Sequence, residues 1–218
     1  MKAVIFDLDN TLFDHSASVT TALRAWLPAL AGVELTDDLL AKWFVVEERN
    51  FNGWLEGRLT HQGQRRGRLR DFLPLIGQPV PATDDELDAV FAGFLTLYEQ
   101  SWQAFPDARR ALEVAKSNGW RIGVLTNGAT TQQNAKLAAI GLADQVDVVA
   151  TSDGLGCSKP APAAYRLTCE ALGVDPAETL MIGDNLELDV LGARAAGLSA
   201  EHLDRPAGIT LDQLIQTV

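Results

Sequence analysis

The segment AVIFDLDNT, residues 3–11, is a short apolar run that ends abruptly in carboxylates. Ala3 to Phe6 are all apolar, and Asp7 and Asp9 follow at once. Continuous apolar runs of this length are typical of strands that are covered on both faces, as in a parallel sheet. Open α/β sheets bind their ligands beyond the carboxyl ends of the strands. The segment therefore predicts a buried strand with a polar site at its end.

Three later segments repeat the pattern of a short apolar run, at residues 122–125, 146–150 and 180–182. Segments with helical spacing, several of them closed by glycine, occupy residues 107–118, 130–140, 160–172 and 186–196. From residue 104 onward the chain thus alternates between helix and strand. This alternation predicts a doubly wound parallel sheet of the α/β class with right-handed crossovers.

Residues 16–103 have a different character. They contain most of the tryptophans, lack a strand-like run, and carry apolar residues at helical spacing, for example Phe91, Phe94 and Leu95. We therefore expect an inserted α-helical subdomain at residues 16–103. Residues 1–15 and 104–218 would then form one α/β core around it.

The composition excludes several classes of protein. The chain has 218 residues, of which 47% are hydrophobic and 22% charged, as in ordinary globular domains. Its 18 basic and 29 acidic side chains give a net charge of −11, which disfavours binding to nucleic acid. Two cysteines are too few for a disulfide framework, and no apolar run approaches the ~18 residues of a membrane span. We expect a soluble cytoplasmic protein without nucleic-acid or membrane partners, either a monomer or a homodimer.

Asp7 and Asp9 point to the same side of an extended chain, because side chains alternate along a strand. Two neighbouring carboxylates repel each other unless a positive charge lies near them. A divalent cation is the simplest such charge, and Mg²⁺ fits best because the available ligands are hard oxygen atoms. Taken alone, the same residues would favour a polar turn and a helix cap.

Three further polar segments lie near the ends of predicted strands or the start of a helix. Thr126 ends one apolar run, and Asp184 follows another with Asp189 five residues later. Lys159 lies directly before a helix that starts with proline. Each segment alone is compatible with a helix cap or a surface lysine. Together they supply a metal site, a nucleophile and a clamp for an oxyanion, which predicts chemistry on a phosphate ester.

In order and spacing these segments resemble the four motifs of the haloacid dehalogenase (HAD) superfamily. The resemblance rests on FDLDNTLFD at 6–14, LTNG at 125–128, SKP at 158–160 and GDNLELD at 183–189, with supporting matches at 136–142 and 192–197. It covers residues 1–15 and the chain from residue 104 onward. The insertion stands where this superfamily places its cap. The resemblance therefore implies a Rossmann-like catalytic core and a helical cap.

The resemblance also implies a role for each motif residue. Asp7 would be the nucleophile that forms an aspartyl-phosphate, and Asp9 the general acid and base. Thr126 would bind a phosphoryl oxygen, and Lys159 would bind phosphate and offset charge at the nucleophile.

An Mg²⁺ site and backbone contacts to phosphate are implied as well. The metal ligands would be Asp7, Asp184 and the main-chain carbonyl of Asp9, with Asp189 as a further carboxylate that orients the site. The backbone amides of Leu8 and Asn127 would contact the phosphate.

The implied activity is that of a Mg²⁺-dependent phosphatase. Its substrate would be a small phosphorylated metabolite of the sugar-phosphate or nucleotide class. A phosphomutase would use the same site, and a 2-haloacid dehalogenase or a non-catalytic binding protein are further alternatives. Dehalogenases of this superfamily lack an acid at the position of Asp9, so Asp9 favours phosphate-ester chemistry.

Arginines are concentrated in the insertion, between residues 58 and 70. They could form a patch that binds an anionic substrate, with Arg58, Arg65 and Arg66 as the first candidates. They could also form a solvated helix face that pairs with nearby glutamates, and this interpretation is favoured.

Aromatic residues of the insertion also have two interpretations. Trp43, Phe51 and Trp54 could stack on a ring of the substrate. The pattern favours the alternative that they form the core of the insertion, because large aromatic side chains are mostly buried.

Overall fold

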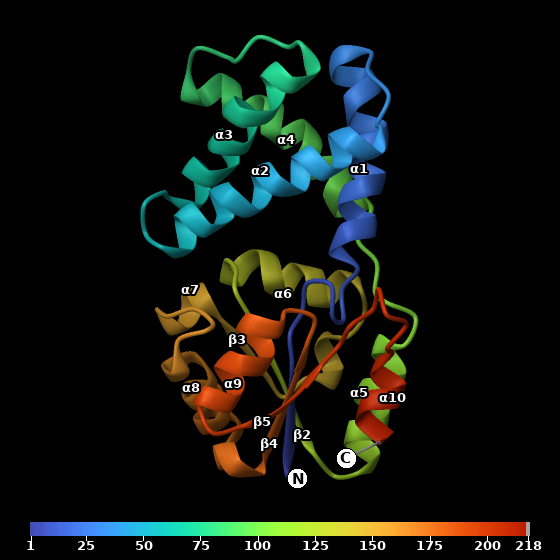
Figure 1. Ribbon diagram of the computed structural model, residues 1–218, viewed down its shortest axis with the longest axis vertical. Helices are drawn as coiled ribbons and strands as arrows, with labels where there is room; N and C mark the ends of the chain where they lie inside the picture. Colours follow the sequence, from blue (N-terminus) through green and yellow to red (C-terminus); the bar gives the residue numbers. More distant parts are fainter. Residues whose placement is uncertain (217–218) are drawn as a thin grey trace. The chain divides into compact units, whose positions relative to one another are not determined.

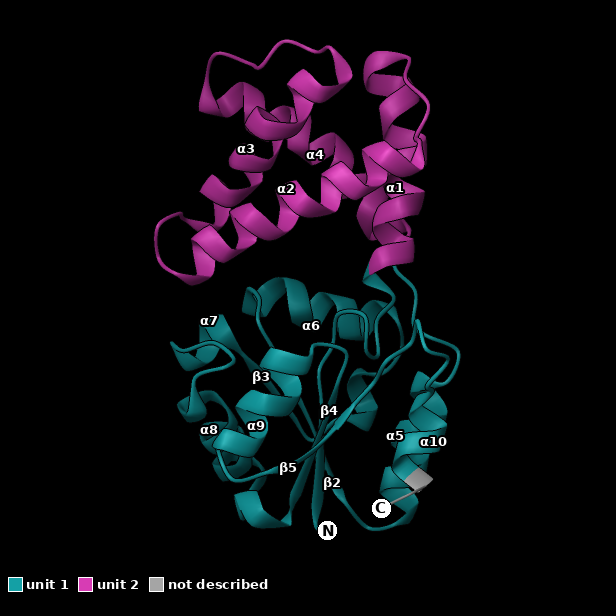
Figure 2. Ribbon diagram, viewed as in Figure 1, with its two compact units in different colours: residues 1–15, 102–218 teal, residues 16–101 magenta. Residues whose placement is uncertain are grey.

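The computed structural model describes residues 1–216 and separates into two compact units. The first, which we call the α/β unit, comprises residues 1–15 and the chain from Trp102 onward (Figure 2). The second, the helical unit, comprises Ser16–Ser101. The second boundary lies two residues before the position expected from the sequence.

A five-stranded parallel sheet forms the centre of the α/β unit (Figure 1). Its strands are β1 (Ala3–Phe6), β2 (Arg121–Thr126), β3 (Val148–Thr151), β4 (Thr179–Gly183) and β5 (Ser199–His202). The order is β3-β2-β1-β4-β5, and every neighbouring pair is parallel. The α/β class is therefore confirmed. Because β1 lies between β2 and β4, its carboxyl end is flanked by the ends of both neighbours.

Helices cover both faces of the sheet. Helices α5 (Ala108–Ser117) and α10 (Leu211–Gln216) pack together on one face, and α8 (Pro162–Leu172) and α9 (Gly192–Ala195) pack together on the other (Figure 1). The remaining helical segments of this unit are α6 (Thr130–Ala139), α7 (Ser152–Leu155), the 3₁₀ turns η2 (Ala143–Gln145) and η3 (Pro176–Glu178), and the π-helix η4 (Leu186–Leu191). The helix predicted at 186–196 is thus a π-helical segment followed by a short α-helix.

The core of the α/β unit forms where strands meet α8. Every side chain of β1 is fully buried, and Ile5 lies in one apolar cluster with Tyr165 and Leu172 of α8. Gly123 of β2 lets α8 approach closely, since a Cβ there would lie 2.9 Å from the Leu172 side chain. This packing fixes β1, and the carboxylates that follow it, against the neighbouring strands.

The helical unit contains four helices around an aromatic core. They are α1 (His15–Ala31), α2 (Asp37–Leu55), α3 (His61–Phe72) and α4 (Asp84–Gln100), with the 3₁₀ turn η1 (Leu73–Ile76) after α3. Threonine side chains cap α2, α3 and α4, and Thr83 forms a full capping box with Glu86. Trp43 is fully buried, with its ring 4.9 Å from that of Phe72 and 4.7 Å from that of Phe94. Trp43 is therefore a core residue.

Within residues 1–216 no helix has the length and apolar character required to cross a membrane.

Arg205 ties the loop after β1 to a distant part of the α/β unit. Its guanidinium donates to the carbonyl oxygens of Thr11 at 2.6 Å and Asn10 at 3.3 Å. It also forms two hydrogen bonds of 3.1 and 3.2 Å to the Asp107 carboxylate, and it lies over the ring of Phe105. The loop that follows the candidate nucleophile is therefore held by a largely buried, charge-assisted network.

Replacing Arg205 tests this network. We expect Arg205→Ala to lower the free energy of unfolding by about 2–4 kcal/mol, because two carbonyl groups lose their guanidinium donor and Asp107 keeps only its hydrogen bond from the Leu211 amide. Urea unfolding followed by circular dichroism measures the change. The matched control is Arg166→Ala on the exposed side of α8, and equal unfolding midpoints for the two variants would contradict the assignment.

Candidate active site

Lys159 connects two carboxylates beyond the carboxyl end of the sheet. Its Nζ donates to Oδ1 of Asp7 and to Oδ1 of Asp189, each at 2.6 Å. Lys159 is 3% exposed, Asp7 6% and Asp189 1%, so the ion pairs are shielded from water. Asp7 follows β1 directly, and Asp189 belongs to η4 after β4. Segments far apart in the chain thus meet at one buried ammonium group.

Asn127 fixes the backbone of Lys159. Its side-chain oxygen accepts from the Lys159 amide at 2.9 Å, and its side-chain nitrogen donates to the Lys159 carbonyl at 3.0 Å. The Asn of the LTNG segment therefore positions the lysine. The expected contacts of the Asn127 and Leu8 amides with phosphate stay predictions.

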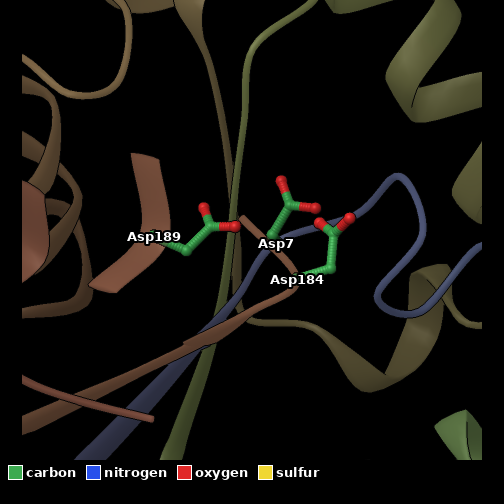
Figure 3. A group of neighbouring side chains, drawn as sticks. All are labelled: Asp7, Asp184 and Asp189. Carbon is green, nitrogen blue, oxygen red and sulfur yellow. The ribbon is translucent and has the colours of Figure 1, made fainter. Parts of the chain in front are cut away.

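Asp184 completes a group of three carboxylates with Asp7 and Asp189 (Figure 3). One oxygen atom from each residue lies within 4.8 Å of the other two. The Asp184 amide donates to the Thr11 hydroxyl at 3.2 Å, and the Asp189 carboxylate accepts from the Asn185 amide at 3.0 Å. The group therefore depends on the backbone of the β4–η4 loop as well as on the strand ends.

Gly183 allows the third carboxylate to approach. A Cβ at this position would lie 2.3 Å from the carboxylate carbon of Asp189. No side-chain adjustment accommodates so short a distance, so the glycine before Asp184 is required by packing at the site.

Negative charge exceeds positive charge in this group. Burial raises the pKa of Asp7 well above its ordinary value; Lys159 opposes the shift, and Asp189 and Asp184 add to it. Burial likewise raises the pKa of Asp184 to about 6, with a further contribution from Asp189. For Lys159, burial is outweighed by the two carboxylates, which raise its pKa above the ordinary value and keep it charged. A divalent cation fits this all-oxygen donor set, because it would offset the charge that one ammonium group leaves uncompensated.

Asp9 belongs to a separate network. Its carboxylate accepts from Lys136 Nζ at 2.6 Å and from Gln133 Nε2 at 3.1 Å. Burial alone would raise its pKa, but Lys136, His15 and the hydrogen bonds together lower it below its ordinary value. Within residues 1–216 the carboxylate of Asp9 lies outside the three-carboxylate group. The expected metal contact through its main-chain carbonyl stays a prediction.

Thr126 lies at the end of β2 and is linked to Asp9 through one side chain. Its hydroxyl accepts from Gln133 Nε2 at 2.6 Å, and that nitrogen is the same one that donates to Asp9. Sequence reasoning assigned no role to Gln133 or Lys136. A signal was present, because the two residues are three apart on the helix after the LTNG segment and therefore share one face.

The candidate arginines of the helical unit have different surroundings. Arg58 pairs with Glu56 on an exposed surface, whereas Arg66 bridges α3 to α4 through Asp84 and Asp88. Arg65 lies 5.5 Å from the ring centre of Phe91, and burial lowers its pKa. A role of these arginines in substrate binding stays a prediction.

The comparison with known families identifies the chain. A family model for haloacid dehalogenase-like hydrolases matches residues 1–197. The chain belongs to this family. The expected hydrolase is thereby confirmed.

Several named proteins are similar to this HAD-like hydrolase. A phosphoserine phosphatase of Thermus thermophilus is 41% identical over 94% of this chain and 89% of its own length. A ribulose-1,5-bisphosphate 5-phosphatase of Halopiger xanaduensis is 32% identical over 93% and 84%. The crystal structure of the HAD-hydrolase YfnB from Bacillus subtilis bound to magnesium superposes with a TM-score of 0.84 at 21% identity, over 99% of this chain and 97% of the other. The similarity to YfnB shows the fold alone. The two phosphatases support an enzyme that acts on phosphoric monoesters.

Removing the Asp184 charge should stabilise the metal-free protein. The pKa of Asp184 is about 6 in the folded protein, against an ordinary value of 3.8. Between these two pH values the Asp184 carboxyl is ionised in the unfolded chain but protonated in the folded protein, so the folded protein loses stability as the pH rises from about 4 to about 6. We therefore expect Asp184→Asn in EDTA to be more stable than wild type by about 1–3 kcal/mol at pH 7–8, and the difference to shrink toward pH 4.

Urea unfolding at several pH values measures this difference. Adding Mg²⁺ should reverse the order, because the ion stabilises only the protein that binds it well. A pH-independent difference between the two proteins, or equal stabilisation of both by Mg²⁺, would contradict the assignment.

Proposed function

We propose that this HAD-like hydrolase is a Mg²⁺-dependent phosphatase that hydrolyses a small phosphomonoester through an aspartyl-phosphate on Asp7. The observation that carries the proposal is the buried bridge from Lys159 to Asp7 and Asp189, with Asp184 beside it and Asp9 held in a separate network. Asp7 is thereby held beside the Lys159 ammonium group, which orients it as a nucleophile for phosphorus. The Asp9 carboxylate is kept apart for proton transfer.

The reaction would proceed in two steps. A carboxylate oxygen of Asp7 attacks phosphorus, and the bond from phosphorus to the ester oxygen breaks. Asp9 in its protonated form gives its proton to that departing oxygen, which leaves as an alcohol. Asp9, now a carboxylate, takes a proton from a water molecule whose oxygen attacks the phosphorus of the aspartyl-phosphate. The bond between phosphorus and the Asp7 oxygen breaks as inorganic phosphate leaves, so Asp7 is again a carboxylate and Asp9 is again protonated.

Lys159 and Thr126 would serve the transferring group. The Lys159 ammonium orients Asp7 through a 2.6 Å hydrogen bond and offsets the charge of the incoming phosphate. The Thr126 hydroxyl, at the end of the neighbouring strand, would donate to a phosphoryl oxygen. Both groups are buried, so their interactions with an anion are strengthened by the low local dielectric.

Asp7 and Asp184 would hold Mg²⁺, together with the carbonyl of Asp9, and Asp189 would orient the site. When bound, the ion supplies positive charge at the phosphoryl oxygens. The Asp189 carboxylate accepts a hydrogen bond from Lys159 Nζ and so fixes the lysine side chain in place.

The proposed substrate class is that of small phosphorylated metabolites. The two relatives described above are named for a sugar bisphosphate and for phosphoserine, which supports small phosphomonoesters and favours sugar phosphates over nucleotides. We also propose that the α/β unit is the catalytic core, that the helical unit is its cap, and that the protein acts in the cytoplasm, where its two free cysteines stay reduced.

Phosphate release tests the proposed function. We expect release from p-nitrophenyl phosphate and from members of a panel of sugar phosphates, phosphoserine and nucleotides, with Mg²⁺ present and not with EDTA. Asp7→Asn should lower kcat by about 1000-fold or more, because it removes the nucleophile.

The control is Asp144→Asn, which removes an exposed carboxylate from η2 and should retain full activity. Retained turnover in Asp7→Asn would overturn the mechanism. Isomerisation that requires a bisphosphate activator would point to a phosphomutase, and halide release from a 2-haloacid would point to a dehalogenase.

A further inference from the structure

We propose that Gln133 and Lys136 of α6 are positioning residues that hold the Asp9 carboxylate for proton transfer to the leaving group. The inference rests on the proposed function and extends it to two side chains outside the four motifs. Lys136 donates to one carboxylate oxygen of Asp9 at 2.6 Å, and Gln133 donates to the other at 3.1 Å. Both oxygens of the proposed acid and base are therefore oriented by one helix face.

The burial pattern of α6 supports a dedicated role. The buried residues of this helix are Gln133, Lys136 and Leu137, so two of the three are polar. Gln133 is 2% and Lys136 4% exposed. Burying an amide and an ammonium group is unfavourable unless each has a hydrogen-bond partner. Two apolar side chains at these positions would bury the same face of α6 without that cost. Both side chains find their partner in Asp9.

The neighbours of the two side chains restrict their movement. Gly128 leaves room for Gln133, because a Cβ at residue 128 would lie 2.8 Å from the Gln133 side chain. Lys136 Nζ lies 4.8 Å from the ring centre of Phe13, which is fully buried and packs edge-on against Trp102. The amide and the ammonium group thus approach Asp9 from fixed directions.

Asp9 lies directly before a turn, and the orientation of its carboxylate matters for proton transfer. Asp9 is half-buried, and the next residue, Asn10, has a φ of 61°, in the left-handed region that non-glycine residues rarely adopt. The hydrogen bonds from Gln133 and Lys136 hold the carboxylate that precedes this turn. A displacement of about 1 Å from a reactive geometry can reduce a rate by about 100-fold.

Gln133 also couples the proton-transfer group to the phosphate site. Its Nε2 donates to both Thr126 Oγ1, at 2.6 Å, and Asp9 Oδ2, at 3.1 Å. A single nitrogen atom therefore sets the spacing between the hydroxyl proposed to bind a phosphoryl oxygen and the carboxylate proposed to protonate the ester oxygen. Lys136 in turn stabilises the Asp9 carboxylate that remains once its proton has moved to the leaving group.

Leaving-group dependence tests the positioning role. p-Nitrophenolate leaves without a proton, whereas the alcohol of an alkyl phosphate requires one. With enzyme in excess over substrate, we expect Lys136→Met and Gln133→Leu to slow alcohol release from the best alkyl phosphate of the panel by about 10–100-fold. Release of p-nitrophenolate should change by less than about 3-fold. Rapid quench and stopped-flow absorbance measure the two rates.

Three further variants make the test specific. Asp9→Asn should show the same selectivity, and adding Lys136→Met to it should slow alcohol release by no more than about 2-fold, because the lysine acts through Asp9. Lys136→Arg keeps the charge and should recover part of the rate. The matched control, Lys116→Met, removes an exposed lysine of α5 and should leave both rates unchanged.

The outcomes separate the two proposals. Equal slowing of both substrates, no slowing of either, or full additivity with Asp9→Asn would overturn the positioning role while the phosphatase activity of wild type stands. If wild type itself released neither leaving group, the proposed function would fail, and the role of α6 with it. Thermal unfolding of each variant reports whether it is folded, and if Lys136→Met is not, Gln133→Leu provides the test of the positioning role.

Discussion

The buried contact of Lys159 with Asp7 and Asp189 is the interaction on which the rest of the site depends. An ammonium group between two carboxylates is stable away from water only if its geometry is held closely. Asn127 holds the lysine backbone, and Gly183 leaves space for Asp189. The strand order also fixes this geometry. Because β1 lies between β2 and β4, Asp7 at its end lies in the middle of the site.

The site divides its carboxylates between two electrostatic environments. Asp7, Asp184 and Asp189 share one lysine, which leaves an excess of negative charge that a divalent cation would offset. Asp9, only two residues from Asp7, has its own lysine and amide. Neighbouring carboxylates with different surroundings are suited to different tasks. In this account one group attacks phosphorus and the other moves protons.

Much of the fold could be predicted from the sequence, because short apolar runs and glycine-closed helices are local signals. Strand β5 was missed because Ser199 to His202 is an edge strand, partly exposed and without an apolar run. The motif carboxylates and Lys159 were found through their spacing. Gln133 and Lys136 were not assigned a role, because a buried polar residue looks like a surface residue until the partner that it faces, more than 120 residues away, is known.

The most direct test of the central claim is chemical trapping of the phosphorylated nucleophile. A ³²P-labelled substrate is mixed with the Mg²⁺-loaded enzyme, quenched in acid within milliseconds, and the protein is digested and sequenced by mass spectrometry. The account predicts a label that survives a brief cold acid quench, is released by hydroxylamine, lies on the peptide that contains Asp7 and appears before free phosphate, with no label in Asp7→Asn. Release of phosphate with no protein-bound label at any time, or label on another residue, would contradict it.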